Sequence, residues 1–80
     1  MKLYVGNLVY NMTESQLKDL FAPYGEVMGA RIMTDQYTRQ SLNFGYVKMS
    51  NPSDGQTAME MLNGESVNDR LIVVKAAHSA

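Results

Sequence analysis

The side chains best suited to chemistry in this chain are aromatic residues in two short segments, Leu3–Leu8 and Asn43–Met49. Successive side chains of a strand point to opposite faces, so Tyr4 lies on one face of the first segment, and Phe44 and Tyr46 share one face of the second. Aromatic rings gathered on a sheet surface are a platform on which the bases of a single-stranded nucleic acid stack. These rings form such a platform only if their face of the sheet is open.

The composition excludes several other kinds of site. The chain has 80 residues, no cysteine and one histidine, so disulfides and cysteine-ligated metals are unavailable and other metal sites lack their usual ligands. Hydrophobic residues make up 45% of the chain, which is typical of one small folded domain. No apolar run approaches the ~20 residues of a membrane span, and no signal-peptide pattern follows Met1. We therefore expect a soluble intracellular domain without metal or cofactor.

Capping signals and periodicity predict the elements that position the aromatic residues. Thr13 and Gln16 form a capping box before a helix that ends near Pro23. Asn51 and Pro52 begin a second helix, which ends at Leu62. Strands are predicted at Lys2–Gly6, Val27–Thr34, Asn43–Met49 and Arg70–Lys75, with an exposed loop over Asp35–Leu42.

This order, β-α-β-β-α-β, predicts an α+β fold of the ferredoxin-like type. Right-handed crossovers place both helices on one face of a four-stranded antiparallel sheet. Residues 1–77 are expected to form the domain, and residues 78–80, with His78, a short C-terminal tail.

Strand alternation divides the strand residues into two faces. One set is small and aliphatic, which suits packing under helices: Leu3, Val5, Ala30, Ile32, Gly45, Val47, Met49, Ile72 and Val74. The other set mixes aromatic, apolar and cationic residues: Lys2, Tyr4, Arg31, Met33, Leu42, Phe44, Tyr46, Lys48, Leu71, Val73 and Lys75. Two helices cover only one face, so the second set should be open to solvent or to a partner.

The distribution of charge along the chain favours an anionic partner more than the net charge does. The net charge is −1, whereas nucleic-acid-binding domains are usually basic. The predicted strands nevertheless contain only positive charges, on Lys2, Arg31, Lys48, Arg70 and Lys75. The sheet is therefore locally positive, and the near-neutral total predicts few phosphate contacts, modest affinity and a weak dependence on salt.

From about Lys2 to Ala77 the chain resembles the RNA recognition motif family. Leu3-Tyr4-Val5-Gly6-Asn7-Leu8 matches the hexamer pattern of the family. Leu42–Met49 matches its octamer pattern in part, with Leu42, Asn43 and Met49 in place of a cation, a glycine and an aromatic residue.

The resemblance implies a role for each matching residue. Tyr4 and Tyr46 would stack on bases, and Phe44 would insert between neighbouring sugars. Asn7 and the segment Lys75–Ala77 would contact base edges. Leu42 removes a usual phosphate contact, for which Arg31 or Arg39 is a candidate replacement. The RNA-binding residues expected in all are Lys2, Tyr4, Asn7, Arg31, Met33, Arg39, Phe44, Tyr46, Lys48, Lys75 and Ala77.

The resemblance also implies a monomeric, non-catalytic domain that binds single-stranded RNA, and single-stranded DNA more weakly. It would be cytoplasmic as a free-standing bacterial protein, and nuclear or cytoplasmic as a module of a larger eukaryotic protein.

Other interpretations stay open for several of these residues. The three aromatic rings could have no role beyond stabilising the sheet through cross-strand packing, and the cations could form a solvated rim. Asn7 could be a turn residue that caps local backbone, and Tyr37 an exposed loop residue without a role. The alternative function is a protein-interaction variant of the same fold, favoured by the low basicity and by Leu42.

An enzyme is not expected. Acylphosphatases of this topology need a phosphate-binding loop with an arginine, and the segment Asn7–Thr13 contains neither arginine nor glycine. Metal carriers of this topology need a CxxC motif, which a chain without cysteine lacks.

Overall fold

The computed structural model describes residues 1–77 and contains the predicted elements in the predicted order; the tail 78–80, with His78, lies outside the described residues. In chain order the elements are β1 (Lys2–Gly6), α1 (Glu14–Phe21), the 3-10 turn η1 (Ala22–Tyr24), β2 (Val27–Thr34), β3 (Ser41–Met49), α2 (Pro52–Leu62), β4 (Ser66–Val67), β5 (Arg70–Leu71) and β6 (Val73–Ala76).

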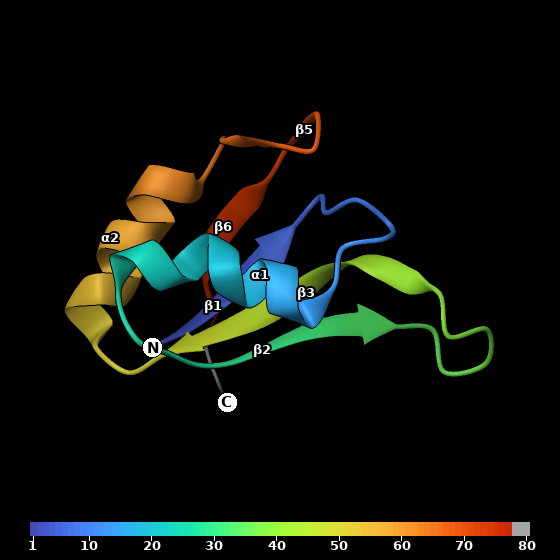
Figure 1. Ribbon diagram of the computed structural model, residues 1–80, viewed down its shortest axis with the longest axis horizontal. Helices are drawn as coiled ribbons and strands as arrows, with labels where there is room; N and C mark the ends of the chain where they lie inside the picture. The colour runs from blue at the N-terminus through green and yellow to red at the C-terminus, as the bar shows by residue number, and fades with distance from the viewer. Residues whose placement is uncertain (78–80) are drawn as a thin grey trace.

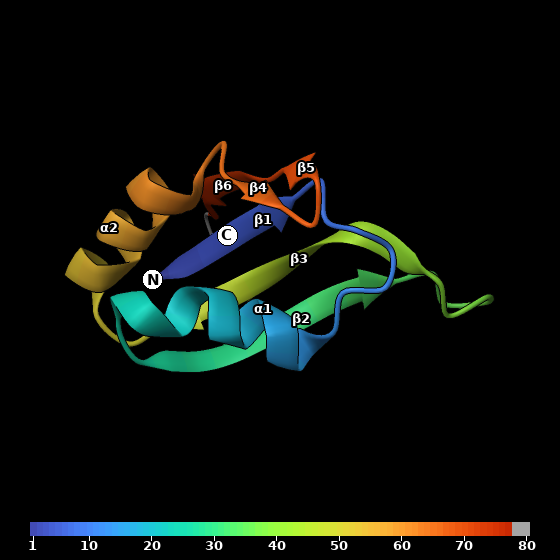
Figure 2. The same cartoon turned by 45° about the horizontal axis from the view of Figure 1, so that its top comes forward.

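The main sheet has four strands in the order β2-β3-β1-β6, and every neighbouring pair is antiparallel. Both helices lie on one face of this sheet (Figure 1), and a turned view shows the same two layers (Figure 2). No element of the described chain covers the opposite face. The predicted ferredoxin-like fold is therefore confirmed, and the strands with the aromatic motifs, β1 and β3, are the two central strands.

Side-chain caps fix the start of each helix as the sequence predicts. Thr13 Oγ1 accepts a hydrogen bond from the Gln16 N–H at 3.0 Å, and Gln16 Oε1 accepts one from the Thr13 N–H at 3.0 Å. Asn51 Oδ1 accepts from the Ser53 N–H at 2.8 Å at the start of α2. These bonds satisfy N–H groups that have no partner inside a helix.

The hydrophobic core lies between the sheet and the helices. It comprises Leu3, Val5, Leu8, Met12, Leu17, Phe21, Val27, Val47, Met49, Ala58, Leu62, Ile72 and Val74. Most of the predicted inner face is in this set, and Ala30 and Ile32 pack against it while half-buried. The division of the strands into two faces is thus correct for the central strands, and the aromatic residues of β1 and β3 lie outside the core.

The predicted fourth strand, Arg70–Lys75, is wrong in its extent. Arg70 and Leu71 form β5, which pairs with β4 in a separate hairpin, and only Val73–Ala76 pairs with β1. Asn68 and Asp69 make the two-residue turn of this hairpin, with φ of 51° and 66°. Asparagine and aspartate adopt such angles more readily than other side chains do.

Strand β3 also begins earlier than predicted, at Ser41, because Ser41 pairs with Thr34 of β2. The loop between β2 and β3 is correspondingly shorter than predicted.

Candidate nucleic-acid interface

Three aromatic rings form a compact cluster on the face of the sheet that the helices leave open. Tyr4 of β1 lies directly opposite Tyr46 of β3, and Phe44 lies opposite Gly6. The ring centroids are 5.6 Å apart for Tyr4 and Phe44, 6.0 Å for Tyr4 and Tyr46, and 6.1 Å for Phe44 and Tyr46. All three rings are half-buried. Each ring thus packs against the other two and keeps an exposed part, which makes the cluster a fixed, partly exposed aromatic surface.

Gly6 provides the space into which the Tyr4 ring leans. A Cβ atom built on Gly6 would lie 2.6 Å from Tyr4 Oη and 2.8 Å from a carbon of the Tyr4 ring. With the ring in this position there is no room for a Cβ at position 6, so a side chain there would require the ring to shift. The glycine of the hexamer pattern thus allows the tyrosine two residues before it to lie over the backbone at the end of β1.

Positive charges surround the three-ring cluster. Lys2 Nζ lies 4.5 Å from the centroid of the Tyr46 ring, and Lys75 Nζ lies 6.0 Å from that of Tyr4. Arg31 of β2 is the neighbour of Tyr46 in the sheet, and Lys48 of β3 is the neighbour of Lys2. The four cationic side chains are exposed. Two of the three rings, Tyr46 and Tyr4, therefore have an ammonium group within cation–π distance.

Beside Tyr46 the surface has a hollow of about 610 Å³. Its lining combines this ring with three of the four cations and three small or apolar neighbours: Met1, Lys2, Gly29, Ala30, Arg31, Tyr46 and Lys48. In this hollow a predicted stacking residue and three predicted charged residues line a common depression.

An irregularity in β3 explains the asparagine that replaces glycine in the octamer pattern. Asn43 has a φ of 65°, and the register between β2 and β3 shifts between Ile32 and Thr34. The Asn43 N–H donates to Ser41 Oγ at 3.0 Å, and its carbonyl accepts from the Leu8 N–H at 2.9 Å. This position needs a left-handed backbone, which asparagine tolerates better than most residues do. Met33 lies at the same irregularity and is half-buried.

The side chain of Asn7 makes three hydrogen bonds within the protein. Its Nδ2 donates to the Leu71 carbonyl at 2.8 Å, and its Oδ1 accepts from Arg70 Nε at 3.2 Å and Nη2 at 2.6 Å. Asn7 also has a φ of 59°. It therefore connects the end of β1 to the β4–β5 hairpin, and a base that binds its amide competes with these bonds. Ala77, the other predicted base contact near a strand end, donates its N–H to the Lys2 carbonyl at 2.9 Å.

Arg39 is not brought together with the three-ring cluster. It lines two small hollows beside Tyr10, together with Ser41. Its loop is ordered by Asp35, whose Oδ1 accepts from the Tyr37 N–H at 2.8 Å and the Thr38 N–H at 2.9 Å. These backbone N–H groups, that of Thr38 first, hold the pKa of the Asp35 carboxyl below its usual value.

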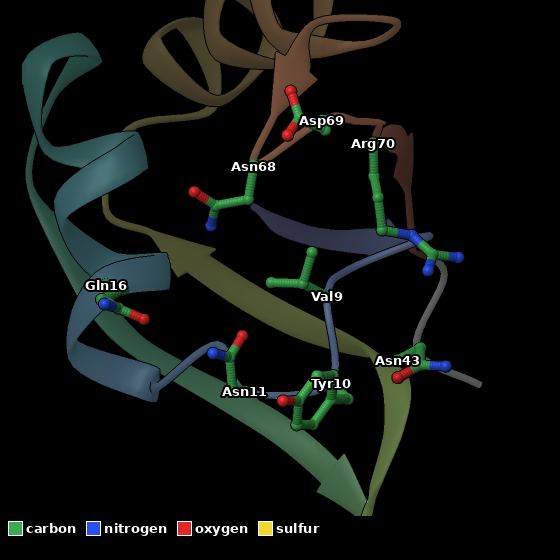
Figure 3. A pocket seen from close by; sticks show the side chains of 8 residues that line it. All are labelled: Val9, Tyr10, Asn11, Gln16, Asn43, Asn68, Asp69 and Arg70. Atoms are coloured by element: carbon green, nitrogen blue, oxygen red, sulfur yellow. The ribbon is translucent and has the colours of Figure 1, made fainter.

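A further hollow, which the sequence did not reveal, lies between the β1–α1 loop and the β4–β5 hairpin (Figure 3). It has a volume of about 640 Å³ and is lined by Val9, Tyr10, Asn11, Gln16, Asn43, Asn68, Asp69 and Arg70. The adjacent Asn68 and Asp69 were a signal for its hairpin, because this pair suits a tight turn.

Within residues 1–77, neither helix has the length and apolarity that a membrane span needs. The same residues contain no cluster of three or more His, Cys, Asp or Glu side chains arranged to hold a metal ion.

Comparison with known proteins identifies the family. A model of the RNA recognition motif matches residues 3–73. RNA-binding protein CP31B, a chloroplastic protein of Arabidopsis thaliana, is 37% identical over 76 residues, which are 95% of this chain and 26% of that protein. The chain therefore spans about a quarter of the length of this relative.

Solved structures agree with the family match. The crystal structure of RNA binding protein PG1 superimposes with a TM-score of 0.96 and 39% identity, over 100% of this chain and 96% of that one. A complex of the Sex-lethal protein with RNA gives a TM-score of 0.92 and 32% identity, over 99% of this chain and 47% of that one. This chain belongs to the RNA recognition motif family.

Proposed function

We propose that the domain binds single-stranded RNA, without catalysis, by stacking bases on Tyr4 and Tyr46, with Phe44 between neighbouring sugars. The observation that carries the proposal is the three-ring cluster on the face opposite the helices, with centroids 5.6 to 6.1 Å apart. Splayed bases of single-stranded RNA stack on rings held in this way, and each such base contributes about 1–3 kcal/mol.

The cations around the cluster supply the electrostatic part of binding. Lys2 and Lys75 lie over the rings of Tyr46 and Tyr4 in the free protein. When a base takes their place, the displaced ammonium groups are available to bind phosphates of the same strand. Arg31 and Lys48 complete the rim beside Tyr46. With a net charge of −1, the protein has little long-range attraction for a polyanion, so stacking supplies most of the affinity.

The remaining predicted contacts have subordinate roles. Met33 extends the apolar surface, while Asn7 and the backbone of Lys75–Ala77 lie where base edges would pass. Arg39, which lies near Tyr10, serves RNA that extends past the end of the sheet. The 2′-hydroxyl groups of RNA favour it over single-stranded DNA, and we propose that the domain acts as a monomer.

Titration of a randomised RNA pool into wild-type protein and into the Tyr4→Ala/Tyr46→Ala double variant tests the proposal. We expect the double variant to lose at least about 30-fold in affinity, the equivalent of two stacked bases. Tyr37→Ala is the matched control, because this tyrosine is 85% exposed in the β2–β3 loop. Equal binding by the wild type and the double variant, or no binding by the wild type, would refute the stacking model.

A further inference from the structure

We propose that the hollow between the β1–α1 loop and the β4–β5 hairpin is a second base-binding site, which takes a nucleotide flanking those on the sheet. This inference rests on the proposed RNA-binding function and extends it to a part of the molecule away from the open face. The hollow measures about 640 Å³, which lies in the range of sites for small organic ligands.

The hollow is close enough to the three-ring cluster for one RNA strand to reach both. Asn43 lines the hollow and Phe44, the next residue of β3, belongs to the cluster. Arg70, also in the lining, is bonded to Asn7 at the end of β1. A strand that leaves the Phe44 end of the sheet therefore passes over this junction and enters the hollow.

The lining offers both interactions by which single-stranded bases are recognised. Tyr10 presents its ring to solvent with 79% of its surface exposed, and it stands at the mouth of the hollow (Figure 3). An exposed ring suits stacking, and primary amides present the donor and acceptor pairs that match base edges. The amides here come from four separate elements or loops: Asn11, Gln16, Asn43 and Asn68.

Several of these amide groups still have bonding capacity. Among residues 1–77, the side chains of Asn11 and Asn68 make no hydrogen bond, and Gln16 uses only Oε1, toward the Thr13 N–H. Asn43 Oδ1 is buried without a partner among the same residues. A base that carries N–H donors would supply the missing partner when it enters from the Tyr10 side.

The charge of the hollow favours a base over a phosphate group. Asp69 and Arg70 contribute opposite charges, and the Arg70 guanidinium is already bonded to Asn7 Oδ1 at 2.6 Å. The charges of Asp69 and Arg70 offset each other, so the hollow has no net positive charge to attract a phosphate group, and two of the three Arg70 nitrogens are already used by Asn7. The polar lining also disfavours an apolar peptide. A neutral heterocycle that stacks on Tyr10 and bonds the amides fits these constraints best.

A comparison of short and long RNA tests the site. Randomised oligoribonucleotides of about four nucleotides cover the sheet, whereas those of about eight also reach the hollow. We expect Tyr10→Ala to lower the affinity for the long RNA about tenfold, the effect of one lost stacking partner, and to leave the short RNA unaffected. Tyr10→Phe keeps the ring and should bind both RNAs as the wild type does.

The amide groups provide an independent readout. The side-chain NH₂ signals of Asn11 and Asn68 should shift in NMR spectra on addition of the long RNA and stay unchanged with the short one. Asn11→Ala combined with Asn68→Gly, which keeps the positive φ of 51° at position 68 accessible, should lower the affinity for the long RNA alone. Gln56→Ala is the amide control, because Gln56 lies on α2 and bonds Glu60.

The controls separate this inference from the proposed function. Equal effects of Tyr10→Ala on both RNAs, or equal effects of Tyr10→Ala and Tyr37→Ala on the long RNA, would overturn the second site. Unshifted Asn11 and Asn68 signals would also overturn it. Failure of the wild type to bind even the short RNA would instead refute the proposed function, and the second site with it.

Discussion

Tyr4 and Tyr46 face each other across the two central strands of the sheet, with ring centroids 6.0 Å apart and ring planes at 69°. This edge-to-face contact is stabilising in itself, yet it leaves part of each ring exposed. The pair therefore combines a structural contact with a partly exposed aromatic surface, whose geometry depends on Gly6 and whose charge depends on the surrounding cations.

Substitution of Gly6 tests the orientation of the Tyr4 ring. A methyl group at position 6 would lie 2.6 Å from Tyr4 Oη, so in Gly6→Ala the ring must move. Because the ring is a movable side chain, we expect the free energy of unfolding to fall by less than about 1 kcal/mol. The affinity of the Gly6→Ala variant for RNA should fall about tenfold, as expected for one poorly stacked base.

Gly29→Ala is the control for stability, because a Cβ there meets no atom within 4 Å, and Tyr37→Ala in the β2–β3 loop is the control for affinity. Fluorescence anisotropy and urea unfolding measure the two effects. Wild-type affinity in Gly6→Ala would show that the ring orientation is unimportant.

Substitution of Gly45, unlike that of Gly6, should mainly lower the stability of the fold. A Cβ on this residue would clash with the backbone carbonyl oxygen of Arg31 in the neighbouring strand, which is part of the hydrogen-bonded ladder and has little freedom to move. We expect Gly45→Ala to lower the free energy of unfolding by about 3 kcal/mol, measured as a reduced urea midpoint against wild type and Gly29→Ala. An unchanged midpoint would mean that β2 and β3 separate at little cost.

A cation at position 42 should restore the phosphate contact that the family pattern implies. Leu42 is 47% exposed, so Leu42→Arg has room for the guanidinium without repacking. We expect tighter RNA binding and an increase of about 0.7 in the magnitude of the slope of log K against log salt, the value for one phosphate contact to a single strand.

Met61→Arg adds the same charge on α2, at a residue that is 57% exposed. It should leave the salt slope unchanged, because α2 lies on the opposite face of the sheet. Equal slopes for Leu42→Arg and Met61→Arg would place position 42 outside the RNA path.

The loop between β2 and β3 should lose its order in acid. The backbone N–H groups of Thr38 and Tyr37 lower the pKa of Asp35 from its usual value of 3.8. The ionised carboxylate therefore stabilises the folded loop above pH 3.8, and this contribution disappears as the pH falls through the lowered pKa.

Amide NMR signals of Tyr37 and Thr38 should report this titration, with a midpoint below 3.8. In Asp35→Ala they should resemble the acid form at every pH. A midpoint at or above the usual value would contradict the role of Asp35.

The sequence predicted those features of the fold that depend on neighbouring residues. The capping box at Thr13 and Gln16 and the cap at Asn51 are local, and alternation within β1 and β3 depends on one strand at a time. Strands β4 and β5 have two residues each, too few for any periodicity, so the sequence suggested one continuous strand at Arg70–Lys75.

Contacts between distant residues could not be predicted. Asn7 bonds Arg70 and Leu71 across more than 60 positions of the chain, so its part in holding the hairpin is visible only in the folded protein. The position of Arg39 beside Tyr10 depends likewise on the ordered turn at Asp35. The hollow lined by Asn11, Asn43 and Asn68 combines three separate segments, and only that of Asn43 carries a motif, so nothing in the sequence indicated that the three come together.

The most direct test of the central claim is NMR of the protein bound to a short single-stranded RNA, observing nuclear Overhauser effects between base protons and the rings of Tyr4 and Tyr46. Stacking predicts such contacts together with upfield shifts of the base protons, and loss of both in the Tyr4→Ala/Tyr46→Ala variant. RNA that binds with unshifted base protons, and with contacts confined to the helical layer, would contradict the proposal that this sheet face is the RNA-binding site.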